Sequence, residues 1–354
     1  MLLRTHRRHL MTVRTLLLGA LALLALPLPA HAWDRGQVTT FARLPSPTRN
    51  PEGIALDKAG NVYVADFDFR GTSSGVGQIV VFDSAGAFQR VVDVANSSPA
   101  LLGLDFHPQT HELLVIDFGG HKVLRVNARN GKSSLFTTIP KVSADPKAPD
   151  PGPNALTFDA AGNVYISDSF QGIVWRTGRD GGTAEQFASD PLLTTSGVPP
   201  FGANGMAFNR AGTALFVANT GNDTVVRIPV DAAGRAGAAE VFVNSINGAD
   251  GLAIDGSDNV WVVANQADEI VVVDPSGKGI AKLGDFNGIG ADGAPVGFLF
   301  PASLVLRGKF VYVTNLSLDL RLFNPAFNAV DSQYAAQVTV HTVARIVNPL
   351  APSP

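Results

Sequence analysis

Six short segments of the chain each open with a residue that could face its counterparts around a common axis. Four of these six residues carry side-chain oxygens, and two are carboxylates. We call them the inner ring: Glu52, Leu102, Asn154, Asn204, Asp250 and Ala302. Carboxylates that face each other in a narrow space repel one another and lose hydration, and a divalent cation relieves both effects. Carboxylate and amide oxygens without Cys or His favour a hard ion such as Ca²⁺ or Mg²⁺ over Zn²⁺. A water-filled channel lined by hydrogen-bonded polar groups is the alternative that these residues leave open.

The segments that carry the inner ring repeat one β pattern. In residues 51–66 an apolar strand leads through a polar turn to a second apolar strand that ends on Asp66. Successive inner-ring residues lie 50, 52, 50, 46 and 52 positions apart, and a period near 50 built from short strands is typical of propeller blades. The sequence therefore predicts an all-β fold, a six-bladed β-propeller of four-stranded antiparallel blades. We expect Val38–Leu44 to close the last blade by pairing beside Gln337–Ile346.

A second set of polar residues ends the second strand of each repeat. We call it the outer ring: Asp66, Asp117, Asp168, Asn219, Asn265 and Asn315. Asx side chains cap backbone turns at strand ends, and a residue type repeated in every blade serves the blades themselves. We therefore expect the outer ring to be structural, and a functional site to lie where the repeats differ.

Composition narrows the function. Charged residues make up only 16% of the 354 residues and the net charge is −3, so no basic surface for nucleic acid is expected. The chain has no Cys, which excludes thiolate catalysis, disulfides and Cys-ligated zinc.

The first 32 residues have the features of an export signal. Arg residues precede the apolar run 16–28, and Ala30-His31-Ala32 matches a cleavage site. We expect a mature chain from about Trp33, with residues 33–354 forming a single propeller domain that is periplasmic or secreted and free of the membrane after cleavage.

Four segments resemble the senescence-marker-protein/gluconolactonase family, the regucalcin-like propellers. They are Glu52-Gly53, Asn154, Ala203-Asn204-Gly205-Met206 and Ala249-Asp250-Gly251-Leu252. The resemblance implies one divalent metal on the propeller axis, held by Glu52, Asn204 and Asp250, with Asn154 contacting substrate or water. It also implies hydrolysis of lactones, with Asp250 as the general base. Gly152 stands where animal members carry an Arg, so the resemblance does not extend to their sugar-lactone specificity.

Two functions follow as expectations. The first is an exported metal-dependent hydrolase of a small-molecule lactone or ester, with Ca²⁺ favoured and Mg²⁺, Mn²⁺ or Zn²⁺ as alternatives. Arg70 and Phe201, in loops at the mouth, are candidate substrate contacts. The second is a non-catalytic propeller that binds a ligand or protein partner, because the blades also resemble NHL repeats. A carbon–carbon lyase on the same scaffold is a third alternative.

Overall fold

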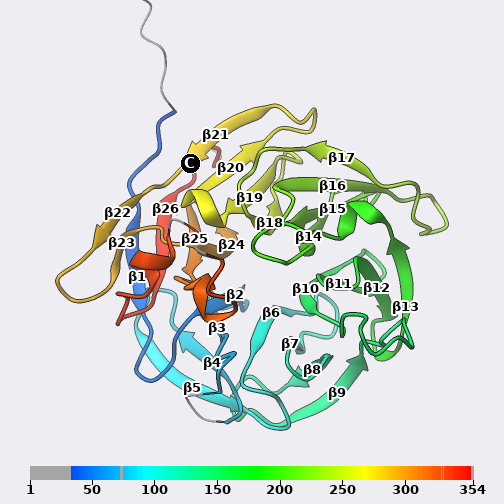
Figure 1. The fold of residues 1–354 in the computed structure, drawn as a ribbon, viewed down its shortest axis with the longest axis horizontal. Coiled ribbons are helices and arrows are strands. Elements are labelled where there is room, and N and C mark those ends of the chain that lie inside the picture. The colour runs from blue at the N-terminus through cyan, green and yellow to red at the C-terminus, as the bar shows by residue number, and fades with distance from the viewer. Residues whose placement is uncertain (1–32, 72–74, 328, 330, 352–354) are drawn as a thin grey trace, which may run out of the picture. The chain divides into compact units, whose positions relative to one another are not determined.

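A computed structural model describes residues 33–71, 75–327, 329 and 331–351, to which all structural statements below refer. These residues form six four-stranded antiparallel sheets that follow one another around a centre, and Figure 1 shows the first strand of each blade nearest that centre. The predicted six-bladed β-propeller is confirmed. The predicted signal segment, residues 1–32, lies outside the described residues.

The first three blades follow the chain in order. Their strands are β2 (Pro51–Leu56), β3 (Val62–Asp66), β4 (Gly77–Phe82) and β5 (Phe88–Val94); β6 (Leu101–Phe106), β7 (Leu113–Asp117), β8 (Lys122–Val126) and β9 (Ser133–Thr138); and β10 (Pro153–Phe158), β11 (Val164–Asp168), β12 (Ile173–Gly178) and β13 (Gly181–Ser189). Strand order in each sheet is the chain order, as expected for consecutive antiparallel hairpins.

The last three blades include the one that closes the ring. Their strands are β14 (Ala203–Phe208), β15 (Ala214–Asn219), β16 (Thr224–Pro229) and β17 (Glu240–Val243); β18 (Ala249–Ile254), β19 (Val260–Ala264), β20 (Glu269–Val273) and β21 (Gly279–Leu283); and β24 (Pro301–Arg307), β25 (Phe310–Asn315), β26 (Thr342–Val347) and β1 (Thr39–Arg43).

The N-terminal strand closes the sixth blade as predicted. Strand β1 pairs antiparallel with β26, with Thr40 opposite Ala344, so blue and red strands lie side by side in Figure 1. The predicted start of the closing C-terminal strand at Gln337 is wrong. Backbone hydrogen bonds of residues 335–338 instead continue the turn of helix α1 (Ser332–Ala335), and β26 begins at Thr342. This pairing supplies the fourth strand of the last blade and covers the edge of β26, so the two ends of the chain are joined within one sheet.

The remaining elements lie in connections. They are the hairpin β22 (Phe286–Ile289) and β23 (Pro295–Gly297) and the short 3₁₀ helices η1 (Pro191–Leu193), η2 (Asn265–Ala267) and η3 (Leu320–Leu322). No helix within the described ranges is long and apolar enough to cross a membrane.

The core lies between the blades and inside them. The second strands β3, β7, β11 and β19 are buried along their whole length, because a middle strand of one blade is covered on both faces by neighbouring blades. Their Val, Ile, Leu and aromatic residues suit a pleated surface buried on both sides. The blades thus form a rigid frame for the residues at its centre.

Each first strand carries a β-bulge at its inner-ring residue. The register with the second strand shifts between Pro51 and Ile54 in blade one, between Ala249 and Leu252 in blade five, and at the equivalent place in all six blades. A bulge re-aims the side chain it contains. Crowding explains the small residue that follows, since a Cβ atom on Gly205 would lie 2.4 Å from the Asp250 carbonyl oxygen of the next blade.

Candidate functional site

The polar residues of the inner ring gather at one cavity. Its volume is about 30 Å³, and we call it the mouth cavity. Its lining comprises Glu52, Phe67, Leu102, Asn154, Pro199, Phe201, Asn204, Thr220, Asp250, Asn265, Phe300, Leu316, Leu318 and Leu320. The predicted metal ligands Glu52, Asn204 and Asp250 are therefore brought together, with Asn154 and Phe201 beside them. All four polar inner-ring side chains are buried, with exposed fractions of 4–5%.

The cavity lies against the central channel of the propeller. The channel has a volume of about 420 Å³ and is lined by the first strands of the blades. Glu52, Asn154 and Asn204 line both spaces. The inner ring is therefore a partition between the mouth cavity and the channel.

The residue that follows the second strand of each blade decides what the inner-ring side chain can contact. We call these six residues the partner positions: Phe67, Phe118, Ser169, Thr220, Asn265 and Leu316. In blade three the Asn154 amide nitrogen donates to Ser169 Oγ over 3.1 Å, and in blade four that of Asn204 donates to Thr220 Oγ1 over 2.9 Å. Sequence reasoning missed Ser169 and Thr220, although hydroxyl residues at partner positions occur only in the two blades whose inner-ring residue is Asn.

The expected outer ring is wrong at one residue, Asn265. In the other five blades the outer-ring residue pairs with the residue before the inner ring, but in blade five Ala264 has that place, opposite Ala249. Asn265 lies one residue further on, at the partner position, and its amide nitrogen donates to Asp250 Oδ2 over 3.0 Å. The length of the first turn could have indicated this position. In blade five, as in blades one and three, the two residues paired next to the first turn are six positions apart in the sequence.

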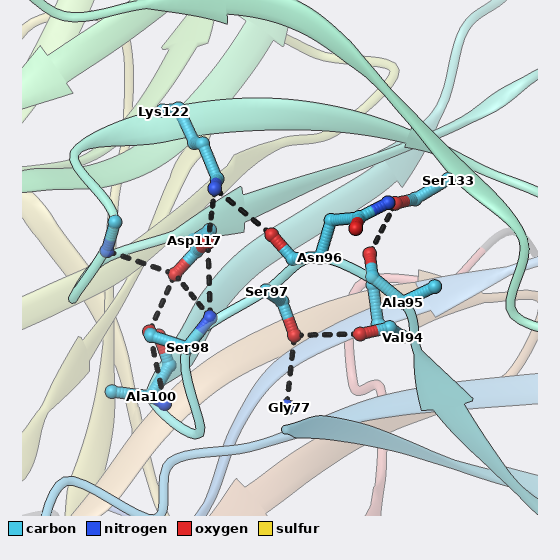
Figure 2. Close-up of polar contacts among 11 residues, drawn as sticks. Gly77, Val94, Ala95, Asn96, Ser97, Ser98, Ala100, Asp117, Lys122 and Ser133 are labelled. Carbon is cyan, nitrogen blue, oxygen red and sulfur yellow. Dashed lines mark hydrogen bonds and ion pairs between the residues drawn. The ribbon is translucent and has the colours of Figure 1, made fainter. Parts of the chain in front are cut away.

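The other outer-ring residues cap turns as predicted. Figure 2 shows Asp117, which accepts hydrogen bonds from Ser98 and lies 3.4 Å from Lys122 Nζ. The same carboxylate accepts from the Gly120 backbone over 2.9 Å. Because these bonds hold loops between strands, the outer ring serves the blades and leaves chemistry to the inner ring.

Several oxygens at the cavity are buried without a hydrogen-bond partner. They include Glu52 Oε2, Asn154 Oδ1 and Asp250 Oδ1. The network fixes the Asn154 amide, because Ser169 Oγ donates to the Ala203 carbonyl and must accept from Asn154 Nδ2. Its Oδ1 is then the free atom. Asn154 Oδ1 and the oxygens of ionised carboxylates only accept, so the cavity lacks the donor or cation that buried acceptors require.

Burial perturbs both carboxylates. Desolvation, and then the negative charge of Asp250, raise the pKa of Glu52 well above its ordinary value of 4.5. Desolvation also raises the pKa of Asp250 to about 7, although the amides of Asn265 and Asn204 act in the opposite direction. Such a pair holds a proton or a cation between its members more readily than two negative charges.

A divalent cation fits this donor set. No three His, Asp or Glu side chains in the described part of the chain gather as a metal-binding group, so a cation here needs amide oxygens as well as the two carboxylates. Oxygen donors alone suit Ca²⁺ or Mg²⁺. Glu52, Asn204 and Asp250 are the residues that could hold the ion.

The two loop candidates have different places. Phe201 lines the mouth cavity. Arg70 is exposed, is not among the residues that line the cavity, and lies 6.0 Å from the ring of its neighbour Phe69. A substrate contact by Arg70 is therefore not supported at this cavity.

The middle of the chain matches a known protein family. Residues 121–284 match the family model described as SMP-30/Gluconolactonase/LRE-like region. The resemblance to this family is confirmed. The matched region contains Asn154, Asn204 and Asp250, while Glu52 precedes it. A search of curated proteins found no match.

Solved structures with the same fold include three named proteins. A calcium-binding protein, regucalcin, from Agrobacterium tumefaciens is 16% identical, and the match covers 87% of this chain and 95% of that one with a TM-score of 0.60. A gluconolactonase from Xanthomonas campestris is 14% identical over 88% and 90%, with a TM-score of 0.58. Virginiamycin B lyase from Staphylococcus aureus is 11% identical over 88% and 98%, with a TM-score of 0.55. At these identities the likeness shows the fold alone, so function has to be argued from the site.

Proposed function

We propose that the chain is an exported, metal-dependent hydrolase of lactones or related esters. The observation that carries the proposal is the group of buried, unpartnered oxygens on Glu52, Asn154 and Asp250. The SMP-30/gluconolactonase match and the fold shared with a gluconolactonase support the reaction class. Structural likeness to a calcium-binding regucalcin supports Ca²⁺ as the favoured ion, with Mg²⁺, Mn²⁺ and Zn²⁺ as alternatives.

In this proposal Glu52, Asn204 and Asp250 hold the ion through oxygens at the mouth cavity. A divalent cation in such a site polarises a carbonyl oxygen and lowers the pKa of water. The blades keep these three residues in place, because each sits on a bulge of a first strand packed against the next blade.

Asp250 is the proposed general base. Asn265 orients the carboxylate through Oδ2, and because each carboxylate oxygen has two lone pairs, Asp250 can hold an ion through Oδ1 and still accept a proton from water. The free Oδ1 of Asn154 can accept a hydrogen bond from the attacking water or from a substrate hydroxyl, while Ser169 prevents the amide from turning over.

The decisive experiment combines metal binding with turnover. Mature protein is titrated with Ca²⁺, Mg²⁺, Mn²⁺ and Zn²⁺ by calorimetry and assayed against lactones and esters with and without metal. Hydrolysis that needs metal and disappears together with metal binding in Asp250→Asn supports the proposal. Tight metal binding with no turnover of any lactone or ester favours the alternative, a propeller that binds a ligand or protein partner.

Export is a separate part of the proposal. It rests on the sequence of residues 1–32 alone. Expression of the full chain in a bacterial host, followed by mass measurement of the periplasmic and secreted protein, tests it. A mature species beginning near Trp33 supports export, and an uncleaved cytoplasmic chain contradicts it.

A further inference from the structure

The mouth cavity has a polar side and an apolar side. At the partner positions of blades three to five, Ser169, Thr220 and Asn265 hydrogen-bond the polar inner ring. In blades six, one and two the equivalent residues are Leu316, Phe67 and Phe118, none of which can donate to an inner-ring side chain. Glu52 therefore faces an apolar neighbour in its own blade, which accounts for its unpartnered oxygen.

Five phenylalanine rings form a closed circuit of contacts around this apolar side. Their successive ring centroids are separated by 5.8, 6.3, 6.4, 4.5 and 5.4 Å in the order Phe67, Phe118, Phe201, Phe323, Phe69 and back to Phe67. We call these five residues the phenylalanine circuit. They come from loops of blades one, two, four and six, so residues far apart in the chain meet beside the cavity. Only Phe67 and Phe201 reach the cavity itself.

The remaining wall of the cavity carries no polar side chain. Apart from the inner ring and the partner positions, it consists of a proline, two phenylalanines and the leucines at 318 and 320. One hydroxyl of a ligand can donate to a free acceptor of the inner ring, but further hydroxyls would face this apolar wall. Each buried hydroxyl left unpaired lowers affinity about tenfold, whereas each buried methylene raises it about fourfold.

The circuit also controls how much space is available. A cavity of about 30 Å³ holds no more than an ion and a water molecule or two. The half-buried Phe201 lines the cavity, and its ring contacts that of Phe323, which is 38% exposed, while the neighbouring Leu322 is 47% exposed. A larger ligand enters if these loop side chains move aside and then repack on it.

We infer that the substrate is a lactone or ester with an alkyl or aryl substituent, held by the phenylalanine circuit while its carbonyl group reaches the inner ring. A polyhydroxylated sugar lactone would place several hydroxyl groups against the phenylalanines and leucines of the wall, so it suits this cavity less well. The inference rests on the proposed function. In the reaction, water adds to the carbonyl carbon and the bond from that carbon to the ring or ester oxygen breaks; the oxygen takes up a proton, and the products are a hydroxy acid, or an acid and an alcohol.

The test compares ligands that differ in apolar length. Calcium-loaded protein is assayed with δ-valerolactone, δ-octalactone, δ-decalactone and glucono-1,5-lactone, and binding of octanoate and gluconate is measured by calorimetry in parallel. We expect kcat/KM to rise about fourfold per methylene over the first few carbons. Octanoate should bind more tightly than gluconate, with a negative heat-capacity change.

Variants connect the effect to the circuit. Phe201→Ser and Phe323→Ser should lower kcat/KM for δ-decalactone at least fivefold and change that for δ-valerolactone less than twofold. Phe88→Ser is the matched control, since Phe88 is 49% exposed on the outer strand β5 and its ring contacts only Phe82 among the described aromatic residues. If Phe201→Ser does not fold, the more exposed Phe323 carries the test alone.

The two hypotheses fail in different ways. Faster turnover of gluconolactone than of alkyl lactones, or tighter binding of gluconate than of octanoate, overturns the inference and leaves the hydrolase intact. Binding of octanoate that weakens in both circuit variants, with no turnover of any lactone or ester, supports an apolar ligand and contradicts the hydrolase.

Discussion

Replacement of Asp250 by Asn should stabilise the metal-free protein while removing its response to calcium. The substitution keeps the size of the side chain and its acceptor for Asn265, and it removes one of two buried negative charges. The pKa of Asp250 rises from its ordinary value of 3.8 to about 7 on folding. A carboxylate whose pKa is raised by folding contributes stability at low pH that is lost as pH rises, here between about pH 4 and pH 7. At pH 8 the full loss is present in the wild type and absent in Asp250→Asn.

The size of the effect follows from the shift. A rise of about 3 pKa units corresponds to about 4 kcal/mol, and entry of water into the cavity lowers this to about 2–4 kcal/mol. For about 320 residues the entropy of unfolding is about 0.7 kcal/mol per kelvin, so each kcal/mol shifts Tm by about 1.5 °C. Asp250→Asn should therefore melt about 3–6 °C above the wild type in EDTA. Calcium at 100 times its Kd adds about 2.7 kcal/mol to the wild type alone.

Thermal unfolding at pH 8, in EDTA and in saturating calcium, measures both quantities. Asp117→Asn is the contrasting control: Asp117 is also fully buried, but it accepts backbone hydrogen bonds and pairs with Lys122, so its replacement should lower Tm in both conditions. A Tm for Asp250→Asn below that of the wild type in EDTA would refute the idea that the inner-ring carboxylates destabilise the empty cavity. A calcium shift that survives in Asp250→Asn would remove this residue from the metal site.

Three further predictions concern charge at and near the site. Calcium affinity should rise between pH 6 and pH 8, because the pKa values of Glu52 and Asp250 are raised and calcium binding therefore releases protons. Calorimetry in buffers of different ionisation enthalpy measures this proton release. If no protons are released, Glu52 and Asp250 are not the ligands. Asn265→Ala should weaken calcium binding about tenfold with little change in the overall fold, because it removes the hydrogen bond that holds Asp250 Oδ2. An unchanged Kd for calcium would mean that Asn265 does not orient the carboxylate. Desolvation, with the charge of Asp331, raises the pKa of Asp268 to about 8, so the stability it contributes at low pH is lost between about pH 4 and pH 8. Asp268→Asn keeps the acceptor for the Phe300 backbone N–H and suits the left-handed conformation at this position. The Tm of this variant should therefore fall less between pH 5 and pH 8 than the Tm of the wild type. An equal fall would exclude Asp268 as the cause of the pH dependence.

The sequence predicted those parts of the molecule that repeat. Blade number, strand order, closure by β1 and the inner ring all follow from a pattern that each blade must satisfy to bury its strands. The partner positions are equally regular, at 51, 51, 51, 45 and 51 residues apart, but their residue types differ between blades, so residue type alone does not reveal them. Asn265 shows the same effect, since its residue type suits the outer ring while its position belongs to the partner positions.

Non-repeating parts could not be predicted in this way. The phenylalanine circuit joins loops of different lengths, and nothing in the spacing of Phe118, Phe201 and Phe323 indicates that their rings meet. The predicted closing strand begins at Gln337, but residues 335–338 continue the turn after Ser332, and β26 has a partner only from Thr342 onward. The sequence repeat predicts the strands of each blade, whereas contacts between loops depend on the positions that the loops take in the folded propeller.

The partition formed by Glu52, Asn154 and Asn204 has the mouth cavity on one side and the central channel on the other. If the proposed hydrolase is correct, the substrate would lie on the cavity side, and water and the ion would have the wider channel on the opposite side. Such a propeller would receive its two reactants from opposite sides of one layer of side chains.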